Sequence, residues 1–209
     1  MKLIPEWYEH KYCLIAWPCN KDLYGKIINK ARDEVANVIN EIAKTEHVIV
    51  LSNKEDINEI QNKTDHKNID IVECKLDDSW MRDIAPIFYI EDEKLKSISF
   101  EFNGYGKYPD YLNDNKISKF ISNYLNIPTK ISDLVIEGGA ITYDDKKNLF
   151  STKNVIFNKN RKQKHNSEYI IKELKLLFDL NYIFLFENGL MEDDTDCLLY
   201  TSPSPRDTA

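Results

Sequence analysis

The chain has 209 residues, of which 42% are hydrophobic and 30% are charged, and its 35 acidic residues exceed its 28 basic ones to give a net charge of −7. This length fits one compact domain. The acidic balance argues against a nucleic-acid-binding protein, which would carry a basic face, and is compatible with a cationic ligand.

No segment predicts export or membrane insertion. The first residues, MKLIPEWYEHKYC, contain no apolar run long enough for a signal peptide, and no stretch approaches the ~18 apolar residues of a membrane helix. The cysteines form no Cys-x-x-Cys pair and suit a reducing compartment better than a disulfide framework: Cys13, Cys19, Cys74 and Cys197. We therefore expect a soluble cytoplasmic protein with no membrane partner.

The first third of the chain alternates strands and helices. Residues 12–17 are predicted to form a buried strand that Pro18 ends. Residues 22–44 predict an amphipathic helix, because apolar residues recur at intervals of three and four: Leu23, Ile27, Ala31, Val35, Val38 and Ile42. Strands are predicted at 47–51 and 69–74, with a short polar helix between them.

A unit of strand, strand, helix and strand is predicted over residues 86–135. Two strands, 86–91 and 95–102, flank the turn EDEK, and their alternation and turn chemistry predict a hairpin. A helix over 114–125 and a strand over 130–135 complete the unit.

The same order returns over residues 139–186. GAITY and NLFST flank the turn DDKK, and a helix over 166–178 precedes a strand over 181–186, with Asn166 or Ser167 as the helix cap. The chain before the first unit is a looser version of it. A period of roughly 50 residues is typical of repeated units in arrays or propellers. A plain α/β sandwich with similar spacing by chance is the alternative.

Each predicted unit ends in an acidic loop. LDDSWMRD follows the strand at 69–74, IEGG follows the strand at 130–135, and LMEDDTD follows the strand at 181–186. Units related by rotation about one axis would place the three loops at the same end of it. Their carboxylates would then repel and raise one another's pKa unless a cation lay among them.

That cation could be a metal or an organic group. The calcium-loop pattern is missing, and no histidines have the close spacing of zinc ligands, since His10, His47, His66 and His165 are scattered singly. The glycines of EGG do not form a phosphate loop, because a glutamate there would repel phosphate. We therefore predict neither metal nor cofactor.

A guanidinium group fits the acidic loops best, because carboxylates accept its N–H donors in pairs. The face of Trp80 would add cation–π attraction, although core packing is the simpler explanation of that residue. Gly138 and Gly139 would let backbone approach a ligand closely. Arg82 is expected to form an ion pair with a neighbouring acid and so hold its loop in shape.

The same residues resemble the agmatine deiminase and bacterial-type peptidylarginine deiminase family. The matching stretches are PEWYEHKYCLIAWP, DSWMRDIAP, FEFNGYGKY, IEGGAI and GLMEDDTD, in order and at similar spacing over residues 1–196. Ala85 is a small departure, because glycine is commoner there. The resemblance implies an α/β fold, a five-bladed pentein-type propeller of strand–strand–helix–strand units around a central site. About three of the five units would be present here.

The resemblance also implies a site and a reaction. By motif position, Asp83 and Glu137 correspond to the catalytic carboxylates that hold the guanidinium nitrogens, and Trp80 and Asp196 are expected to bind substrate as well. A cysteine attacks the guanidinium carbon, ammonia leaves, and water hydrolyses the amidino-thioether, with a histidine as acid and then base. No cofactor is implied.

Agmatine is the expected partner, because the free α-carboxylate of arginine would meet like charge in an acidic site. Peptidyl-arginine also lacks that carboxylate and stays open as a substrate. Two more hypotheses stay open, namely transfer of the amidino group to an amine and a non-catalytic protein that only binds guanidinium. The sequence does not decide the oligomeric state.

The resemblance stops at Asp196. The family's histidine motif would follow there, and its cysteine lies near the end of a longer chain, so Cys197 matches neither position. Residues 197–209, rich in Ser and Pro, resemble a translated sequencing adapter. We expect an unstructured tail here, without packing over Thr201–Ala209, and no hydrolysis by the given chain alone.

Overall fold

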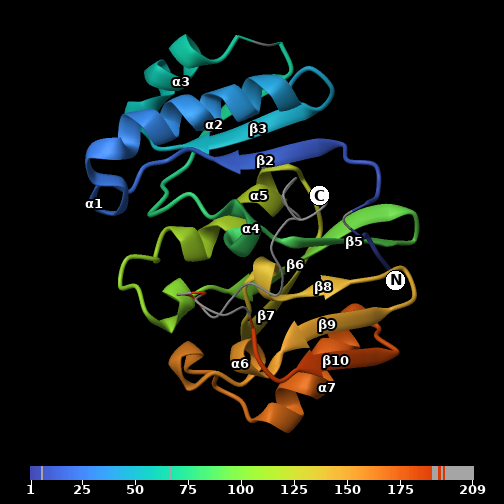
Figure 1. The fold of residues 1–209 in the computed structure, drawn as a ribbon. Helices are drawn as coiled ribbons and strands as arrows, with labels where there is room; N and C mark the ends of the chain where they lie inside the picture. The colour runs from blue at the N-terminus through green and yellow to red at the C-terminus, as the bar shows by residue number, and fades with distance from the viewer. Residues whose placement is uncertain (6, 66, 190–192, 194, 196–209) are drawn as a thin grey trace, which may run out of the picture.

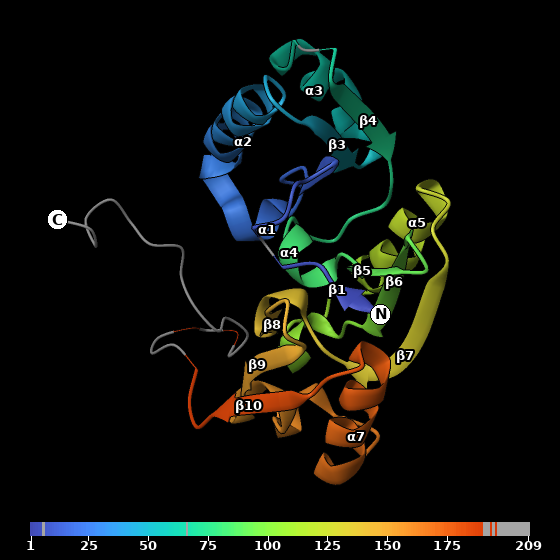
Figure 2. The same ribbon diagram turned by 90° about the vertical axis from the view of Figure 1, so that its right-hand side faces the viewer.

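Three small sheets, one after another along the chain, form the framework of the molecule (Figure 1). The computed structural model describes residues 1–5, 7–65, 67–189, 193 and 195. Figure 2 shows that the sheets follow one another around an arc. Over the described residues this arc does not close into a ring.

The first sheet is entirely parallel. It consists of β2 (Tyr12–Ala16), β3 (His47–Ser52) and β4 (Ile69–Glu73), in the order β2-β3-β4. The connections are α2 (Ile28–Ile42) and α3 (Ile57–Lys63), because parallel neighbours need a crossover. β3 is buried along almost its whole length, as expected for a central strand with both faces covered.

The strand β3 joins two hydrophobic cores. Val48 and Val50 pack with Trp17 in a small core under the helices, while Ile49 and Leu51 point into the main core. The main core continues through the other two sheets. The alternation of side chains along one strand therefore holds the first unit to the second.

The second sheet is mixed. It contains β1 (Lys2–Leu3), β5 (Ile87–Glu91), β6 (Lys94–Glu101) and β7 (Thr129–Val135), in the order β1-β5-β6-β7. β5 and β6 are the antiparallel hairpin that the sequence predicts, and β7 joins β6 in parallel after α5 (Ile117–Tyr124).

The third sheet repeats this pattern. β8 (Thr142–Tyr143) pairs antiparallel with β9 (Asn148–Thr152), and β10 (Tyr182–Phe186) pairs parallel with β9. Between β9 and β10 lie the short helix α6 (Lys153–Ile156), which the sequence did not predict, and α7 (Ser167–Phe178). The cap of α7 is Asn166, whose side chain accepts a hydrogen bond from the Tyr169 N–H at 2.9 Å.

The second and third sheets therefore share one topology, a hairpin followed by a helix and a parallel strand. This confirms the predicted repeat of two strand–strand–helix–strand units. The first sheet departs from it, because all its strands are parallel and a helix separates each pair.

The helix predicted over residues 22–44 is wrong in two respects. It is divided into α1 (Lys21–Tyr24), a 3₁₀ turn (Gly25–Ile27) and α2. Its buried face is also different, because three residues of the predicted apolar stripe are more than half exposed: Leu23 54%, Ile27 62% and Val38 52%. The buried face carries Arg32, which forms ion pairs with Asp56 and Glu59.

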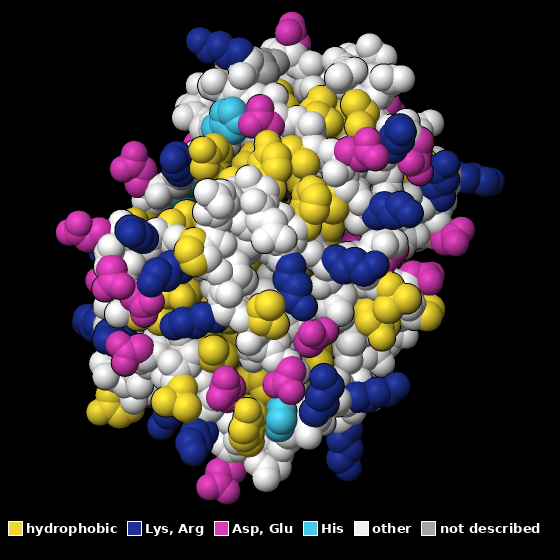
Figure 3. All heavy atoms as spheres, turned by 180° about the vertical axis from the view of Figure 1, so that it is seen from behind, with side chains coloured by type: hydrophobic (Ala, Val, Ile, Leu, Met, Phe, Trp, Pro, Cys, Tyr) yellow, Lys and Arg dark blue, Asp and Glu magenta, His cyan; other side chains and the backbone are white. Residues whose placement is uncertain are grey.

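The surface mixes charges of both signs. In Figure 3, Lys and Arg side chains alternate with Asp and Glu over the face seen from behind. Among the described residues, no helix combines the length and the apolar character needed to cross a membrane.

Candidate active site

Two acidic residues near the start of DDSWMRDIAP stabilise the loop itself. The Asp114 carboxylate, just before α5, accepts hydrogen bonds from the backbone N–H groups of Asp77 at 2.9 Å and Asp78 at 3.1 Å. The Asp77 carboxylate in turn accepts a bond from the backbone N–H of Asn113 at 2.7 Å. This exchange fixes the loop after β4 against the start of α5. Burial raises the pKa of Asp114 to about 7.

The third acid of this stretch, Asp83, lies in a one-turn helix, α4 (Met81–Ile84), and only 9% of it is exposed. One carboxylate oxygen accepts a hydrogen bond from the Tyr105 hydroxyl at 2.8 Å, and the other accepts one from the Gly139 N–H at 3.0 Å. The first acidic loop is thus bonded directly to the second, as the predicted convergence of the loops requires.

The glycines of EGG allow this contact. A Cβ atom on Gly139 would lie 2.4 Å from an Asp83 carboxylate oxygen, and one on Gly138 would lie 2.2 Å from the Arg82 carbonyl oxygen. Neither distance leaves room for a methyl group. The close approach that the sequence predicts for these glycines is therefore made to α4, and it brings Glu137 up against the first loop.

Tyr105 is held in a left-handed backbone conformation, with φ 59°, between two glycines with φ 63° and 71°. Such a conformation is unfavourable for a large side chain and persists only where its surroundings impose it. Here a Cβ atom on Gly106 would lie 2.0 Å from the Asn160 carbonyl oxygen, so the loop packs directly on that backbone. The packing aims the Tyr105 hydroxyl at Asp83.

Glu137 is fully buried and forms an ion pair with Arg161, whose Nε donates to Oε1 at 3.0 Å. The other oxygen, Oε2, is buried and has no hydrogen-bond partner among the described residues. Burial raises the pKa of the Glu137 carboxyl, and the Arg161 guanidinium opposes that rise. A buried carboxylate with one free oxygen is a group expected at a binding or catalytic site.

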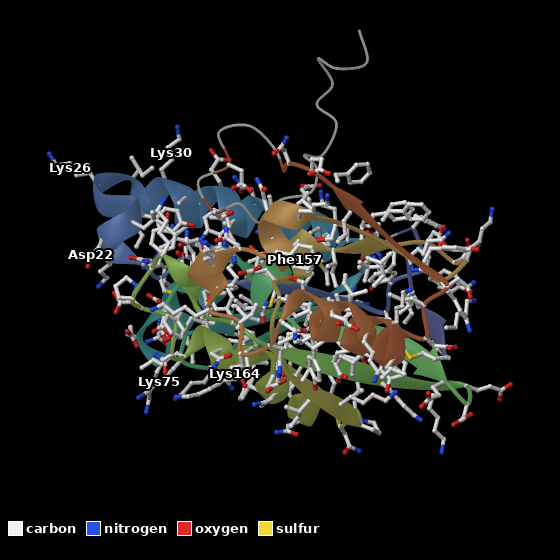
Figure 4. All side chains as sticks on the ribbon, turned by 90° about the horizontal axis from the view of Figure 1, so that it is seen from below. Asp22, Lys26, Lys30, Lys75, Phe157 and Lys164 are labelled. Carbon is white, nitrogen blue, oxygen red and sulfur yellow. The ribbon has the colours of Figure 1, made fainter. Side chains whose placement is uncertain are left out.

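Arg161 is itself only 1% exposed. It ends the 3₁₀ turn Lys159–Arg161, which follows Phe157 and α6; Figure 4 shows Phe157 near the middle of the molecule. Its Nη2 donates to the Thr195 carbonyl at 2.8 Å, in the third acidic loop, and its guanidinium lies 5.9 Å from the centre of the Tyr105 ring. Arg161 thus contacts the second acidic loop at Glu137, the third at Thr195, and the Tyr105 ring, whose hydroxyl binds Asp83 of the first.

Trp80 lines a pocket of about 310 Å³ beside these groups. Half of its surface is exposed, and its indole N–H donates to Asp78 at 2.9 Å, so the core-packing interpretation is wrong. The pocket wall is acidic and aromatic and also includes Tyr105 and Thr195, which contact Asp83 and Arg161 respectively. Asp83 and Glu137 are not among its lining residues, but Asp83 is bonded to the hydroxyl of Tyr105, which is one of them.

Of the remaining predicted site residues, Asp196 lies outside the described residues, as do Cys197 and Thr201–Ala209. The ion pair expected for Arg82 stays a prediction. Within the described part of the chain, no three His, Cys, Asp or Glu side chains are placed to hold a metal ion. The sequence analysis did not identify Arg161, because this residue lies in none of the matching stretches. It assigned no role to Tyr105 either, although the position of this residue between two glycines could have indicated an unusual backbone conformation.

Comparisons with known proteins agree with this geometry. The family model described as Porphyromonas-type peptidyl-arginine deiminase matches residues 2–199. A putative agmatine deiminase of Mycoplasma capricolum is 30% identical over 197 residues, which cover 91% of this chain and 54% of that protein. The agmatine deiminase of Pseudomonas aeruginosa is 28% identical over 198 residues, with the same two coverages of 91% and 54%. The chain thus spans about half the length of the curated relatives it matches.

Solved structures show the same fold. The agmatine deiminase of Enterococcus faecalis superposes with a TM-score of 0.88 at 18% identity, covering 95% of this chain and 56% of that one. A C. jejuni agmatine deiminase variant with substrate bound gives a TM-score of 0.84 at 28% identity, covering 94% and 59%. The implied α/β propeller architecture is confirmed, and this chain belongs to the Porphyromonas-type peptidyl-arginine deiminase family.

Proposed function

We propose that residues 1–196 form the guanidinium-binding part of an enzyme that hydrolyses agmatine to N-carbamoylputrescine and ammonia, a reaction of putrescine biosynthesis. The observation that carries this proposal is the direct bonding of two acidic loops. Asp83 is hydrogen-bonded to Gly139 at 3.0 Å, and Glu137, two residues earlier, is buried with one oxygen free among the described residues. Relatives named agmatine deiminase support the reaction class.

In this proposal Asp83 and Glu137 hold the guanidinium nitrogens of the substrate, and Asp196 adds a third carboxylate. Trp80 and the acidic pocket beside it receive the aliphatic chain and the distal ammonium of agmatine. Asp78 and Asp110 line that pocket and would repel the α-carboxylate of free arginine. Charge-assisted bonds from a guanidinium to carboxylates are roughly twice as strong as neutral ones.

None of the three cysteines that the structure describes, Cys13, Cys19 and Cys74, lines the pocket beside Trp80. Burial also raises the pKa of each thiol, that of Cys19 to about 12 and that of Cys74 to about 11. A raised pKa lowers the share of thiolate at neutral pH, and the thiolate is the nucleophile. We propose that the attacking cysteine and the acid–base histidine come from a part of the complete protein outside this sequence. The free thiols support a reducing, cytoplasmic location.

The test is formation of ureido product from agmatine, free arginine and an arginine-containing peptide, measured with the complete reading frame and with residues 1–209. Agmatine should give the highest kcat/KM, and residues 1–209 alone should give no product. Preference for the peptide would favour peptidyl-arginine deimination instead. Binding of agmatine without any turnover by the complete protein would favour a non-catalytic guanidinium-binding protein.

The site residues are tested in the same assay. Asp83→Asn and Glu137→Gln should each lower kcat/KM by about two to three orders of magnitude, the loss typical when one charge-stabilising group is removed. The matched control is Asp133→Asn, whose exposed carboxylate lies on β7, bonds His165 at 2.9 Å and should not affect turnover. Near-normal turnover by either site variant would refute the assignment.

A further inference from the structure

The ion pair between Arg161 and Glu137 is almost completely buried. The two side chains are 1% and 0% exposed, and Nε lies 3.0 Å from Oε1. A buried carboxylate without a partner tends to take up a proton and become neutral. Arg161 places its guanidinium directly on Glu137, and an arginine side chain stays charged in proteins. The pair therefore favours an ionised Glu137 at this position.

The pair also orients the carboxylate. Arg161 uses Nε on Oε1 and directs Nη2 to the Thr195 carbonyl, so it does not close the two-pronged contact that a guanidinium can make with a carboxylate. Oε2 consequently has no partner among the described residues. A fixed carboxylate with one oxygen anchored and the other free is the arrangement needed to receive a donor from a ligand.

Arg161 contacts a second acidic loop directly, at Thr195, and is linked to the first only through Tyr105. Its guanidinium lies 5.9 Å from the centre of the Tyr105 ring, and the Tyr105 hydroxyl donates to Asp83 at 2.8 Å. The Thr195 carbonyl that it binds, at 2.8 Å, belongs to the loop after β10. The backbone of Arg161 is held as well, because its carbonyl accepts a hydrogen bond from the Asn103 side chain at 2.7 Å.

We propose that Arg161 is a positioning residue for the guanidine hydrolysis proposed above: it orients the Glu137 carboxylate, binds the loop after β10 at Thr195, and packs against Tyr105, which holds Asp83. It touches neither the reacting carbon nor the leaving group in this proposal. Its effect on the reaction is exerted through Glu137 and, by way of Tyr105, through Asp83. The inference rests on the proposed function for its catalytic meaning, but the interaction itself can be measured without turnover.

The first measurement is a pH titration of the Glu137 carboxyl by ¹³C NMR in residues 1–209 labelled at the glutamate side-chain carboxyl, with Glu137→Gln used for assignment. Arg161→Gln removes the charge and should raise the Glu137 midpoint by about one unit or more, a tenfold or greater rise in proton affinity. Arg161→Lys keeps a charge and should restore most of the original midpoint.

A matched control is Arg32→Gln. Arg32 is another buried arginine, 7% exposed and ion-paired with Asp56 at 2.8 Å, but it lies on α2 away from the acidic loops. Loss of the Arg32 charge should destabilise the fold and leave the midpoint of the Glu137 pH titration unchanged. Circular dichroism at the titration temperature shows which variants are folded. If Arg161→Gln does not fold, Arg161→Lys serves as the test variant, because it should still change agmatine turnover.

The second measurement is the pH dependence of kcat/KM for agmatine in the complete protein. Arg161→Gln should lower kcat/KM by about two orders of magnitude and move the acidic limb to higher pH, and Arg161→Lys should restore part of both. A folded Arg161→Gln protein with an unchanged Glu137 midpoint and an unchanged acidic limb would overturn the inference. Absence of turnover in the unsubstituted complete protein would refute the proposed function alone, and the NMR titration would still decide the role of Arg161.

Discussion

Replacing Gly138 or Gly139 by alanine tests how the two acidic loops are joined. The added methyl carbon at position 138 would lie 2.2 Å from the Arg82 carbonyl oxygen, and at position 139 it would lie 2.4 Å from an Asp83 carboxylate oxygen. Contacts below 3.0 Å require a movement of the neighbouring group. In the first variant that group is backbone, and in the second it is a side chain that can rotate.

The first substitution should therefore affect mainly the stability of the fold, and the second should also affect binding. Gly138→Ala should lower the free energy of unfolding by about 2–3 kcal/mol, the upper range for overpacking a well-packed site, and so lower Tm by about 4–12 °C. Gly139→Ala should cost about 1–2 kcal/mol, because Asp83 can turn away, but rotation breaks its hydrogen bond from the Gly139 N–H. Only the second variant should lose agmatine binding out of proportion to its loss of stability.

Thermal and urea unfolding, followed by circular dichroism, measure these changes. The control is Gly25→Ala, where a Cβ would meet nothing within 4 Å but the backbone has φ 49°. That variant measures backbone strain alone, about 1–3 kcal/mol, because ψ of −129° at Gly25 lies outside the left-handed helical region. If Gly138→Ala is as stable as the unsubstituted protein, the contact between EGG and α4 is not as close as described.

Two further predictions concern Asp114 and the cap of α7. Burial raises the pKa of Asp114 from 3.8 to about 7, so between these pH values the folded state binds a proton that the unfolded state has lost. Its contribution to stability is therefore present at low pH and is lost as pH rises towards 7, and Asp114→Asn should show a smaller loss of Tm between pH 5 and pH 8 than the unsubstituted protein. An identical loss in both proteins would contradict this. Asn166→Ala should lower the free energy of unfolding by about 1 kcal/mol and Ser167→Ala by clearly less, because only Asn166 caps the helix; equal losses in urea unfolding would count against that assignment.

The elements that the sequence predicted well depend on local chemistry. The turn between β5 and β6 has two successive left-handed residues, Asp92 and Glu93, and a short polar turn of this kind between alternating strands predicts a hairpin. The cap at Asn166 is equally local. Because the same short-range signals occur twice, the repeat of the second and third sheets could be found without knowledge of the tertiary structure.

The buried face of α2 could not be found in this way. The apolar stripe drawn through Ile27 and Val38 assumed that apolar residues point inward. The structure buries Arg32 instead, because Asp56 and Glu59 lie within 2.8 Å and 2.5 Å of its guanidinium and offset the cost of removing the charge from water. Those acids come from the segment after β3, so their position depends on the pairing of the sheet and not on the helix sequence.

The same limit explains why the sequence indicated the acidic loops but not the arginine that lies among them. The sequence indicates that carboxylates converge, and a cation must then accompany them. That reasoning does not say where the cation comes from, and a ligand was the natural candidate. At Glu137 the chain itself provides a cation, Arg161. This residue lies 24 positions later, in a segment without periodicity. It reaches the carboxylate from the 3₁₀ turn Lys159–Arg161, which packs against Gly106. In the function proposed above, the substrate guanidinium binds at Oε2, the oxygen without a partner among the described residues, and the orientation set by Arg161 would then be as important to recognition as the negative charge itself.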